Sequence, residues 1–363
     1  MQNSNPAMPA LAVKGALDFR LDPACRTAFL LTEGGEAWGA RLSAALRGEA
    51  SRAGLDIVIG GEGMRRLAPH RRPLAFLPAR PVLPSALTPR DVLALLPSPL
   101  LSPKAALAAL GLGARADTPW RHLSPSERRR LMLAAFLCRH PSPALLVVEE
   151  PEEGLDAATL RHLGALLDPG GAFGEAAFLL LARQAASVFA LAKEVGVLHE
   201  GGLGVIAAPQ RLYEEPPDLL TALAMGPANL LPVRLVAVED DEAEVECADG
   251  RRFWCAAPPP GVALGERTCL MIRPERIAMA ALAAAELEGG AITAVITRVL
   301  ERGSGVVFHL HLDLGAAWEV WRPAALGGRL QAGERVLLAW PERAARLYPF
   351  APRGAEGDGE RAR

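Results

Sequence analysis

The sequence predicts a mostly parallel α/β domain that is followed by a small all-β domain. In the first part of the chain, continuous apolar runs alternate with helix-like segments, a pattern typical of parallel strands buried on both faces. After about Gly226, short apolar runs follow one another closely between polar turns, which favours a barrel-like β module. The expected boundaries are 1–225 and 226–352, followed by a charged, low-complexity tail at 353–363 that is expected to be disordered.

The apolar runs predict the strands of the first domain, and the segments between them predict its helices. The expected strands are 27–32, 55–61, 74–79, 144–150 and 176–182. The expected helices are 40–46, 126–139 and 157–167. The stretch from His70 to Pro103 contains eight prolines, Pro103 included, so it is expected to be an irregular surface excursion with short helices.

The second domain is expected to consist of short strands that are joined by tight turns. They are predicted within 233–256, 266–277, 291–323 and 334–341. In the third of these segments, His309 and His311 lie two residues apart and would share a face of one strand, so a metal site is one interpretation and a plain strand the other. Three tryptophans are expected to form barrel core or subunit contacts: Trp318, Trp321 and Trp340.

Length and composition limit the functional class. The chain has 363 residues, a formal net charge of −2 and 50% hydrophobic residues, so it can bury a core, and its charge gives no reason to expect nucleic-acid binding. Its five cysteines show no C-x-x-C spacing, which indicates a reducing compartment. No apolar run approaches the roughly 18 residues that span a bilayer, and the start of the chain has no signal-peptide pattern. We therefore expect a soluble, cytoplasmic chain.

The segment LSPSERRRLMLAAFLCRHPSPALLVVEEPEEGLD, 123–156, resembles the signature, helix, Walker B and D-loop block of ABC-transporter ATPases in order and spacing. Residues 67–93 resemble the region of that family's Q-loop. MIRPERI, 271–277, is similar to a recurrent motif in the C-terminal β domain of importer subunits. ERGSGVVFHLHLDLG, 301–315, is most similar to the spermidine/putrescine and ferric-iron branch.

The resemblance implies a P-loop NTPase-like ABC ATPase domain followed by an OB-like TOBE domain. It implies ATP and Mg²⁺ as cofactors. Its implied partners are the transmembrane permease subunits and a second ATP-binding subunit, in a homo- or heterodimer. It also implies a peripheral location on the inner face of the plasma membrane.

The turn that corresponds to the family's P-loop lacks the usual chemistry. A P-loop needs glycines whose neighbouring N–H groups face phosphate, a lysine for the β/γ phosphates, and a Ser or Thr for Mg²⁺. In TEGGEAWGARL, 32–42, matching the glycines leaves no lysine in any register, because none lies between 15 and 103. Glu33 and Glu36 add negative charge, whereas an arginine at 41 is an alternative cation. The candidate nucleotide-binding positions are Gly34, Gly35, Gly39, Ala40 (at the lysine position) and Arg41 (at the Ser/Thr position).

Two further positions also depart from the family pattern. Pro78 stands where the Q-loop glutamine is expected, and proline has no side-chain amide. Arg183 stands at the switch-histidine position after the strand at 176–182; it could contact a γ-phosphate but does not titrate as histidine does.

The signature and Walker B region keeps more of the family's residues. Glu150 matches the catalytic general base, and Glu149 stands at the Mg²⁺-associated aspartate position. The resemblance gives Ser124, Ser126 and Asp156 a place in contacts with a nucleotide that the opposite subunit holds. A structural role is compatible with this, because Ser124 as N-cap, Pro125 and Glu127 form a capping-box pattern.

The sequence therefore predicts an ATP-binding subunit of a polyamine or ferric-iron ABC importer with a degenerate nucleotide site. Such a subunit would be weakly catalytic or non-catalytic. The alternatives are an active ATPase with an arginine-assisted P-loop and a ligand-sensing regulatory subunit.

Overall fold

The computed structural model describes residues 9–15, 17–49, 54–96, 101–139, 142–258, 262–281, 292–303, 305–324 and 330–349. The predicted tail at 353–363 lies outside these residues. The chain forms two compact units, Met1–Pro216 and Pro217–Arg363. The domain limits expected from the sequence, 225/226 and 352, stay predictions.

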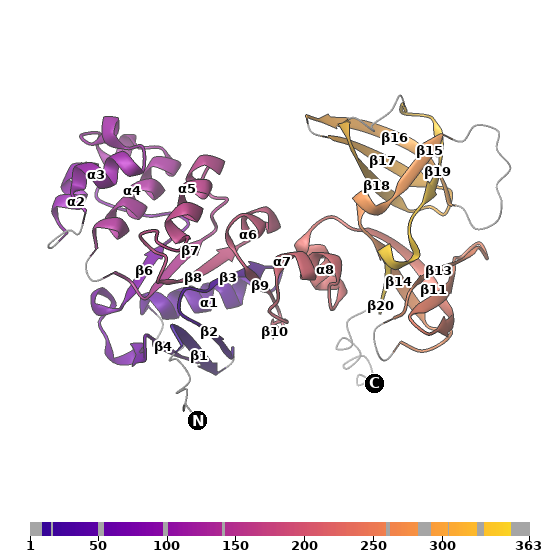
Figure 1. Cartoon of the computed structure of the whole chain (residues 1–363), viewed down its shortest axis with the longest axis horizontal. Coiled ribbons are helices and arrows are strands. Elements are labelled where there is room, and N and C mark those ends of the chain that lie inside the picture. The colour runs from indigo at the N-terminus through magenta and orange to yellow at the C-terminus, as the bar shows by residue number, and fades with distance from the viewer. Residues whose placement is uncertain are drawn as a thin grey trace, which may run out of the picture. The chain divides into compact units, whose positions relative to one another are not determined.

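The first unit is built around a six-stranded sheet whose five main strands are parallel (Figure 1). In spatial order the strands are β10 (Gly202–Leu203), β9 (Glu194–His199), β3 (Arg26–Leu31), β8 (Ala177–Ala182), β7 (Leu145–Glu149) and β6 (Leu74–Leu77). All six residues of β8 are buried, as expected for a strand covered on both faces. The carboxyl ends of β3, β7 and β8 meet at one edge of the sheet, where the candidate site lies.

A second, antiparallel sheet accounts for the start of the chain. Its strands, in spatial order, are β2 (Phe19–Leu21), β1 (Leu11–Gly15), β4 (Leu55–Ile59) and β5 (Glu62–Gly63). The strand predicted at 55–61 therefore forms, but it pairs with β1 instead of joining the parallel sheet. Phe19 is buried and packs edge-on against Phe29 of β3, with ring centroids 4.8 Å apart.

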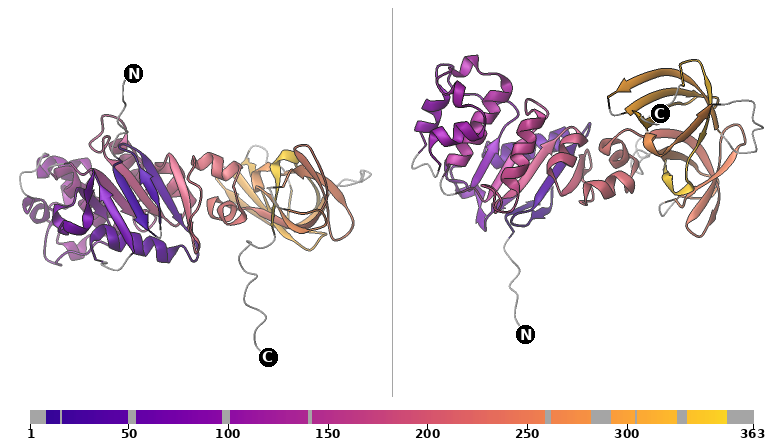
Figure 2. Two further views of the ribbon diagram at one scale, coloured as in Figure 1. Left: turned by 90° about the horizontal axis from the view of Figure 1, so that it is seen from below. Right: turned by 45° about the horizontal axis from the view of Figure 1, so that its top comes forward.

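Helices of the first unit lie on both faces of the main sheet (Figure 2). They are α1 (Glu36–Arg47), α2 (Pro89–Ala94), α3 (Pro103–Ala109), α4 (Pro125–Cys138), α5 (Ala157–Leu167), α6 (Ala185–Leu191) and α7 (Pro209–Glu214). Leu42 and Leu46 of α1 share one core with β1, β4, β3, β7 and β8, whereas α4 and α6 contact strands of the main sheet. None of the helices in the described part of the chain is long and apolar enough to cross a membrane.

Helix α1 begins at Glu36, four residues before the helix predicted at 40–46. Gly35 is its N-cap, and Glu36 places a carboxylate in the first turn, where the helix dipole favours negative charge. At the other end, Gly48 has a left-handed conformation, and its N–H donates to the carbonyls of Ala44 and Ala45. The acidic first turn and the two glycine caps thus account for the observed start of α1 at Glu36, whereas the apolar pattern alone predicts a start at residue 40.

The second unit consists of two five-stranded antiparallel sheets whose inner faces share one core (Figure 2). Helix α8 (Leu219–Met225) precedes them. The first sheet contains β13 (Arg252–Ala256), β12 (Glu242–Glu246), β11 (Asn229–Glu239), β14 (Arg267–Ile272) and β20 (Ala345–Pro349). The second contains β15 (Ala278–Ala281), β19 (Arg335–Ala339), β16 (Ile292–Arg302), β17 (Gly305–Leu312) and β18 (Ala317–Pro323). The predicted order, an α/β domain with a mostly parallel sheet followed by a small all-β domain, is confirmed.

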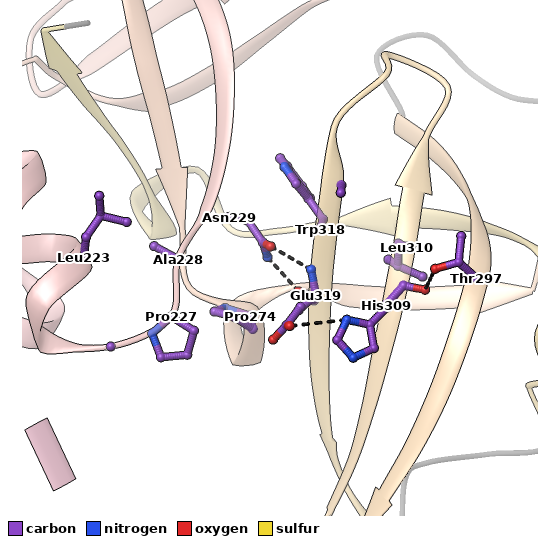
Figure 3. Close-up of a pocket in the computed structure, with 12 residues that line it drawn as sticks. Leu223, Pro227, Ala228, Asn229, Pro274, Thr297, His309, Leu310, Trp318 and Glu319 are labelled. Atoms are coloured by element: carbon purple, nitrogen blue, oxygen red, sulfur yellow. Dashed lines mark hydrogen bonds and ion pairs between the residues drawn. The ribbon is translucent and has the colours of Figure 1, made fainter. Parts of the chain in front are cut away.

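The side chain of Asn229 links β11 to β18, which belong to different sheets of the second unit (Figure 3). Its Nδ2 donates to the Glu319 carbonyl at 2.7 Å, and its Oδ1 accepts from the Glu319 N–H at 2.7 Å. The side chain therefore satisfies both backbone groups of one residue on the edge strand β18. Asn229 is only 4% exposed, so water does not easily replace it.

We expect Asn229→Ala to lower the free energy of unfolding of the second unit by about 2–4 kcal/mol, because two backbone groups lose their partners. Urea unfolding followed by tryptophan fluorescence measures this. Gln331→Ala, an exposed amide in the same unit, is the matched control and should change stability by less than about 0.5 kcal/mol. Equal losses of stability for the two substitutions would show that the Asn229 hydrogen bonds to the Glu319 backbone do not stabilise the second unit.

Candidate functional site

The turn between β3 and α1 is short and closed by its own backbone. It comprises Thr32–Gly35, and the Gly35 N–H donates to the Thr32 carbonyl at 2.9 Å. The Thr32 N–H and hydroxyl both donate to the Leu198 carbonyl of β9, at 3.1 and 2.8 Å. A G-x-x-x-x-G-K loop places six residues before its lysine, whereas residues 32–35 alone separate β3 from α1. The Gly35 N–H is thus used inside the turn and is not presented to an anion.

The three glycines in this segment each have a structural reason. Gly34 has a φ of +83°, a conformation that side chains rarely adopt. A Cβ on Gly35 would lie 1.9 Å from the Leu198 carbonyl oxygen. A Cβ on Gly39 would lie 2.9 Å from a methyl group of Leu31. Close packing against β9 and β3 therefore accounts for two of the glycines, and backbone conformation accounts for the third.

Ala40 and Arg41 are both exposed on α1. The Arg41 guanidinium lies over the Trp38 ring at 4.4 Å from its centroid. The Trp38 indole N–H in turn donates to the Glu200 carbonyl at 3.1 Å. The described ion pairs that join α1 to the ends of the parallel strands involve other residues.

Arg183 connects three elements at the carboxyl edge of the sheet. From the turn after β8, its Nη1 lies 2.5 Å from Oε1 of Glu36 in the first turn of α1. Its Nε lies 3.1 Å from Oε1 of Glu150 after β7, and its backbone N–H donates to Glu152 at 2.5 Å. The hydrogen bond that Arg183 donates to the Glu150 carboxylate is the main cause that raises the pKa of Arg183 above its ordinary value. We call Glu36, Arg183 and Glu150 the carboxylate–arginine bridge.

The carboxylate–arginine bridge affects charge more than stability. The side chains of Arg183, Glu36 and Glu150 are 45%, 54% and 26% exposed. Solvent therefore screens each pair, and such pairs typically contribute about 0–1 kcal/mol. The chemical consequence is that both sides of the Arg183 guanidinium already face carboxylates.

Glu150 is held in an unusual backbone conformation. Its φ is +38°, which is uncommon for a residue with a side chain. Its N–H donates to the Leu181 carbonyl of β8 at 2.6 Å. Its carbonyl accepts from Arg129 Nη1 at 2.6 Å. The Leu181 carbonyl and the Arg129 side chain thus hold the Glu150 backbone from both sides, and the Glu150 side chain is directed to Arg183.

Arg129 of α4 anchors the whole loop that follows β7. Besides the Glu150 carbonyl, its guanidinium donates to the carbonyls of Glu149 at 2.5 Å and Glu153 at 3.2 Å. The side chain is fully buried, and this desolvation lowers the pKa of Arg129 to about 10. Sequence reasoning did not assign it a role, because it is the middle residue of the run Arg128–Arg130 and such runs are usually solvated. Only its burial distinguishes it.

Glu149 is paired differently from Glu150. Its Oε1 lies 3.6 Å from Nη1 of Arg47 at the end of α1. Its Oε2 accepts from the backbone N–H of Ala79, the residue after Pro78, at 3.3 Å. The carboxylates at the predicted Mg²⁺ position, Glu149, and at the predicted general-base position, Glu150, thus face different arginines. The described residues also hold no group of three His, Cys, Asp or Glu that could bind a metal ion, and this applies equally to His309 and His311. Glu149 is thus paired with Arg47 and the Ala79 N–H at the position where the resemblance implies a Mg²⁺-associated carboxylate.

The start of α4 has the predicted capping box. Ser124 Oγ accepts from the Glu127 N–H at 3.1 Å, and the Glu127 carboxylate accepts from the Ser124 N–H at 2.8 Å. That hydrogen bond, with Arg115 nearby, holds the pKa of Glu127 below its ordinary value. The structural role that the sequence predicts for Ser124 and Pro125 is confirmed.

Asp156 and Ser126 lie close to this helix start. Asp156 is the N-cap of α5 and accepts from the Thr159 N–H at 2.7 Å, which lowers the pKa of Asp156. Gly154, in the preceding turn, has a φ of +108°, and a Cβ there would lie 3.4 Å from Pro125. Ser126 Oγ is buried, and its interaction with the Asp156 carboxylate contributes to the lowered pKa of Asp156. The fold thus brings the turn before α5 against the start of α4.

The candidate residues form two groups in the first unit. Glu150 and Arg183 meet at the strand ends, together with Glu36. Ser124, Ser126 and Asp156 gather where α4 and α5 begin. Ala40 and Arg41 join neither group, and Pro78 contributes through the N–H of its neighbour.

Comparison with known proteins identifies relatives for both units. The TOBE domain family matches residues 270–347. The spermidine/putrescine import ATP-binding protein PotA 1 of Pseudomonas aeruginosa is 26% identical over 233 residues, which cover 64% of this chain and 61% of that protein. PotA of Rubrobacter xylanophilus is 26% identical over 304 residues, which cover 79% and 77% of the two chains.

A maltose-type relative shows a similar level of identity. The maltose/maltodextrin import ATP-binding protein MalK of Mannheimia succiniciproducens is 28% identical over 201 residues, which cover 54% of this chain and 52% of that protein. The match therefore spans less than two thirds of the PotA 1 and MalK relatives. In sequence, the chain is therefore similar to the ATP-binding subunits of ABC importers, and residues 270–347 match the TOBE domain family.

Proposed function

We propose that this chain is an ATP-binding-type subunit of an ABC importer whose own nucleotide site is degenerate. It is a weakly catalytic or non-catalytic partner. The carboxylate–arginine bridge carries this proposal. Glu36 places a carboxylate at the positive end of α1, where a phosphate would bind in an intact site. Arg183, which pairs with Glu36 there, is already shared between two carboxylates.

The charges around the β3–α1 turn make phosphate binding there unfavourable. A nucleotide phosphate entering the β3–α1 turn would meet Glu36 and would have no lysine as counter-ion. A lost charge-assisted hydrogen bond costs about 1.5–3 kcal/mol. Partial desolvation and carboxylate–phosphate repulsion add to that cost.

The proposed assembly contains permease transmembrane subunits and a second ATP-binding subunit, on the cytoplasmic face of the membrane. Ser124, Ser126 and Asp156 would face ATP and Mg²⁺ held by that second subunit. Ser124 and Asp156 use acceptor positions in their caps, and the Ser124 hydroxyl keeps its proton for another acceptor. The names of the relatives favour a polyamine or a maltodextrin as cargo. The ferric-iron alternative stays a prediction.

We expect the purified chain to bind a fluorescent ATP analogue weakly and to hydrolyse ATP at the background rate. Glu150→Gln removes the only candidate general base and should not change that rate. Arg183→Ala tests the bridge separately and should leave turnover at background. Turnover that is well above background and disappears in Glu150→Gln would establish the alternative, an active ATPase with an arginine-assisted P-loop.

A further inference from the structure

The loops that follow β7 and β8 are joined by the carboxylate of Glu152 as well as by the carboxylate–arginine bridge. Oε1 of Glu152 accepts from the backbone N–H of Arg183 at 2.5 Å, and Oε2 accepts from the Ser187 hydroxyl at 3.5 Å. Ser187 lies in the first turn of α6 and is 5% exposed. The Arg183 backbone is therefore tied to the loop after β7, while its guanidinium is directed towards Glu36 and Glu150.

Helix α1 is attached to the loop after β7 near both of its ends. At its start, Glu36 is connected to Glu150 through the Arg183 guanidinium. In its last turn, Nη1 of Arg47 lies 3.6 Å from Oε1 of Glu149. These contacts are ion pairs between side chains, so substitutions that remove a single charge test them directly.

The contacts of Glu36 are of the kind that a bound phosphate makes in a nucleotide-binding protein. A phosphate is attracted to the start of a helix and to an arginine, and through such contacts it can hold loops in place. The Glu36 carboxylate lies in the first turn of α1 and pairs with Arg183 at 2.5 Å. Because this carboxylate is part of the chain, the contact forms without the translational entropy cost of a free ligand.

We propose that the Glu36 carboxylate is a built-in substitute for a phosphate, which holds the loops after β7 and β8 against α1 at every nucleotide concentration. This edge of the sheet then keeps one arrangement, whereas in a nucleotide switch the loops are released when the phosphate leaves. The proposal rests on the proposed function, because it concerns the same degenerate site. It adds that the degenerate site does not respond to nucleotide.

Amide hydrogen exchange of the full-length chain without nucleotide tests the contact. Glu36→Gln keeps the shape of the side chain and removes its charge. The reporter amides are those of Arg183 and Glu150, which are hydrogen-bonded at this edge of the sheet. We expect both to exchange about two- to fivefold faster in Glu36→Gln, the size of effect that a partly exposed ion pair allows.

Two further variants separate the Arg183 contact from other effects of charge. Glu33→Gln makes the same charge change at an exposed position of the preceding turn and should leave both exchange rates unchanged. The double variant Glu36→Gln, Ala37→Glu keeps the net charge and an acidic residue in the first turn of α1, but places it on a different side of the helix. It should exchange as fast as Glu36→Gln. Slow exchange in the double variant would show that the helix dipole alone accounts for Glu36, and would overturn the proposal.

Replacement of the carboxylate by a free anion tests its role as a phosphate substitute. In Glu36→Ala, millimolar inorganic phosphate should restore slow exchange of the two reporter amides, whereas sodium chloride at equal ionic strength should not. The unmodified chain should show no difference between the two salts. The proposal is wrong if Glu36→Gln exchanges as slowly as the unmodified chain, if the two salts act alike on Glu36→Ala, or if phosphate also slows exchange in the unmodified chain.

These outcomes are independent of the test of the proposed function. ATP turnover well above background would overturn the proposed function. Exchange is measured without ATP, so the contact that Glu36 makes is tested whether or not the chain hydrolyses ATP, and the two failures are distinguishable.

Discussion

Arg129→Met should lower the free energy of unfolding of the first unit by about 3–5 kcal/mol. The substitution keeps most of the apolar stem but removes the donors to three carbonyls, those of Glu149, Glu150 and Glu153. Buried carbonyls without partners cost about 1–3 kcal/mol each. Desolvation of the buried guanidinium opposes folding and lowers the pKa of Arg129 to about 10. The substitution removes this desolvation cost, which offsets part of the loss in stability. Chemical denaturation followed by circular dichroism measures the net effect.

Arg130→Met is the matched control for this experiment. Arg130 is the next residue of α4. Among the described residues, its guanidinium donates to one carbonyl, that of Leu110, at 3.2 Å. We expect a loss of about 1 kcal/mol. Hydrogen exchange should localise the difference, with faster exchange of the Glu150 and Glu153 amides in Arg129→Met only. Losses of similar size for both variants would show that Arg129 does not anchor the loop.

The second unit should lose stability steeply above about pH 9. Burial in its core raises the pKa of Cys247 to about 11 and of Cys255 to about 12, from an ordinary value of 9.0. Burial also raises the pKa of Tyr348. Above pH 9 the unfolded thiols release protons that the folded thiols keep, so stability is full below pH 9 and falls as pH rises towards 11–12. At about 1.4 kcal/mol per pKa unit for each thiol, the loss is on the order of 5 kcal/mol at pH 11.

The slope of unfolding free energy against pH between 8 and 11 measures this effect, with the tryptophan fluorescence of the second unit as signal. The double variant Cys247→Ala, Cys255→Ala should have a much shallower slope, although its stability at pH 8 is lower because two small cavities form. Cys138→Ala in α4 of the first unit is the control and should leave the slope unchanged. An unchanged slope in the double variant would exclude the two thiols as the cause.

Much of the fold follows from local sequence patterns. Strands β7 and β8 are continuous apolar runs, and such runs form only where both faces of a sheet are covered. The capping box of Ser124 and Glu127 is equally local, since its partners lie three residues apart. Periodicity and caps therefore predict these elements without knowledge of their neighbours.

The parts that sequence patterns do not predict depend on contacts between distant residues. The apolar run at 55–61 does not show that its partner is β1 at the start of the chain. Glu36 looks like a charge that repels phosphate, and only the fold brings Arg183, 147 positions away, to pair with it. Arg129 belongs to a basic run, and nothing local distinguishes the arginine that is buried. Local sequence patterns therefore do not predict which side chains pair at the edge of the sheet.

The early start of α1 restricts how an ATP site could be regained. Glu36 and position 40 are four residues apart on one helix, so they share a face. A lysine introduced by Ala40→Lys would meet the Glu36 carboxylate one helical turn away and would be neutralised there. With Ala40 at the lysine position, the six preceding residues of a phosphate-binding loop would be 34–39, and residues 36–39 already belong to α1. We therefore expect that a return to nucleotide binding requires the first turn of α1 to unwind, in addition to the substitution at position 40.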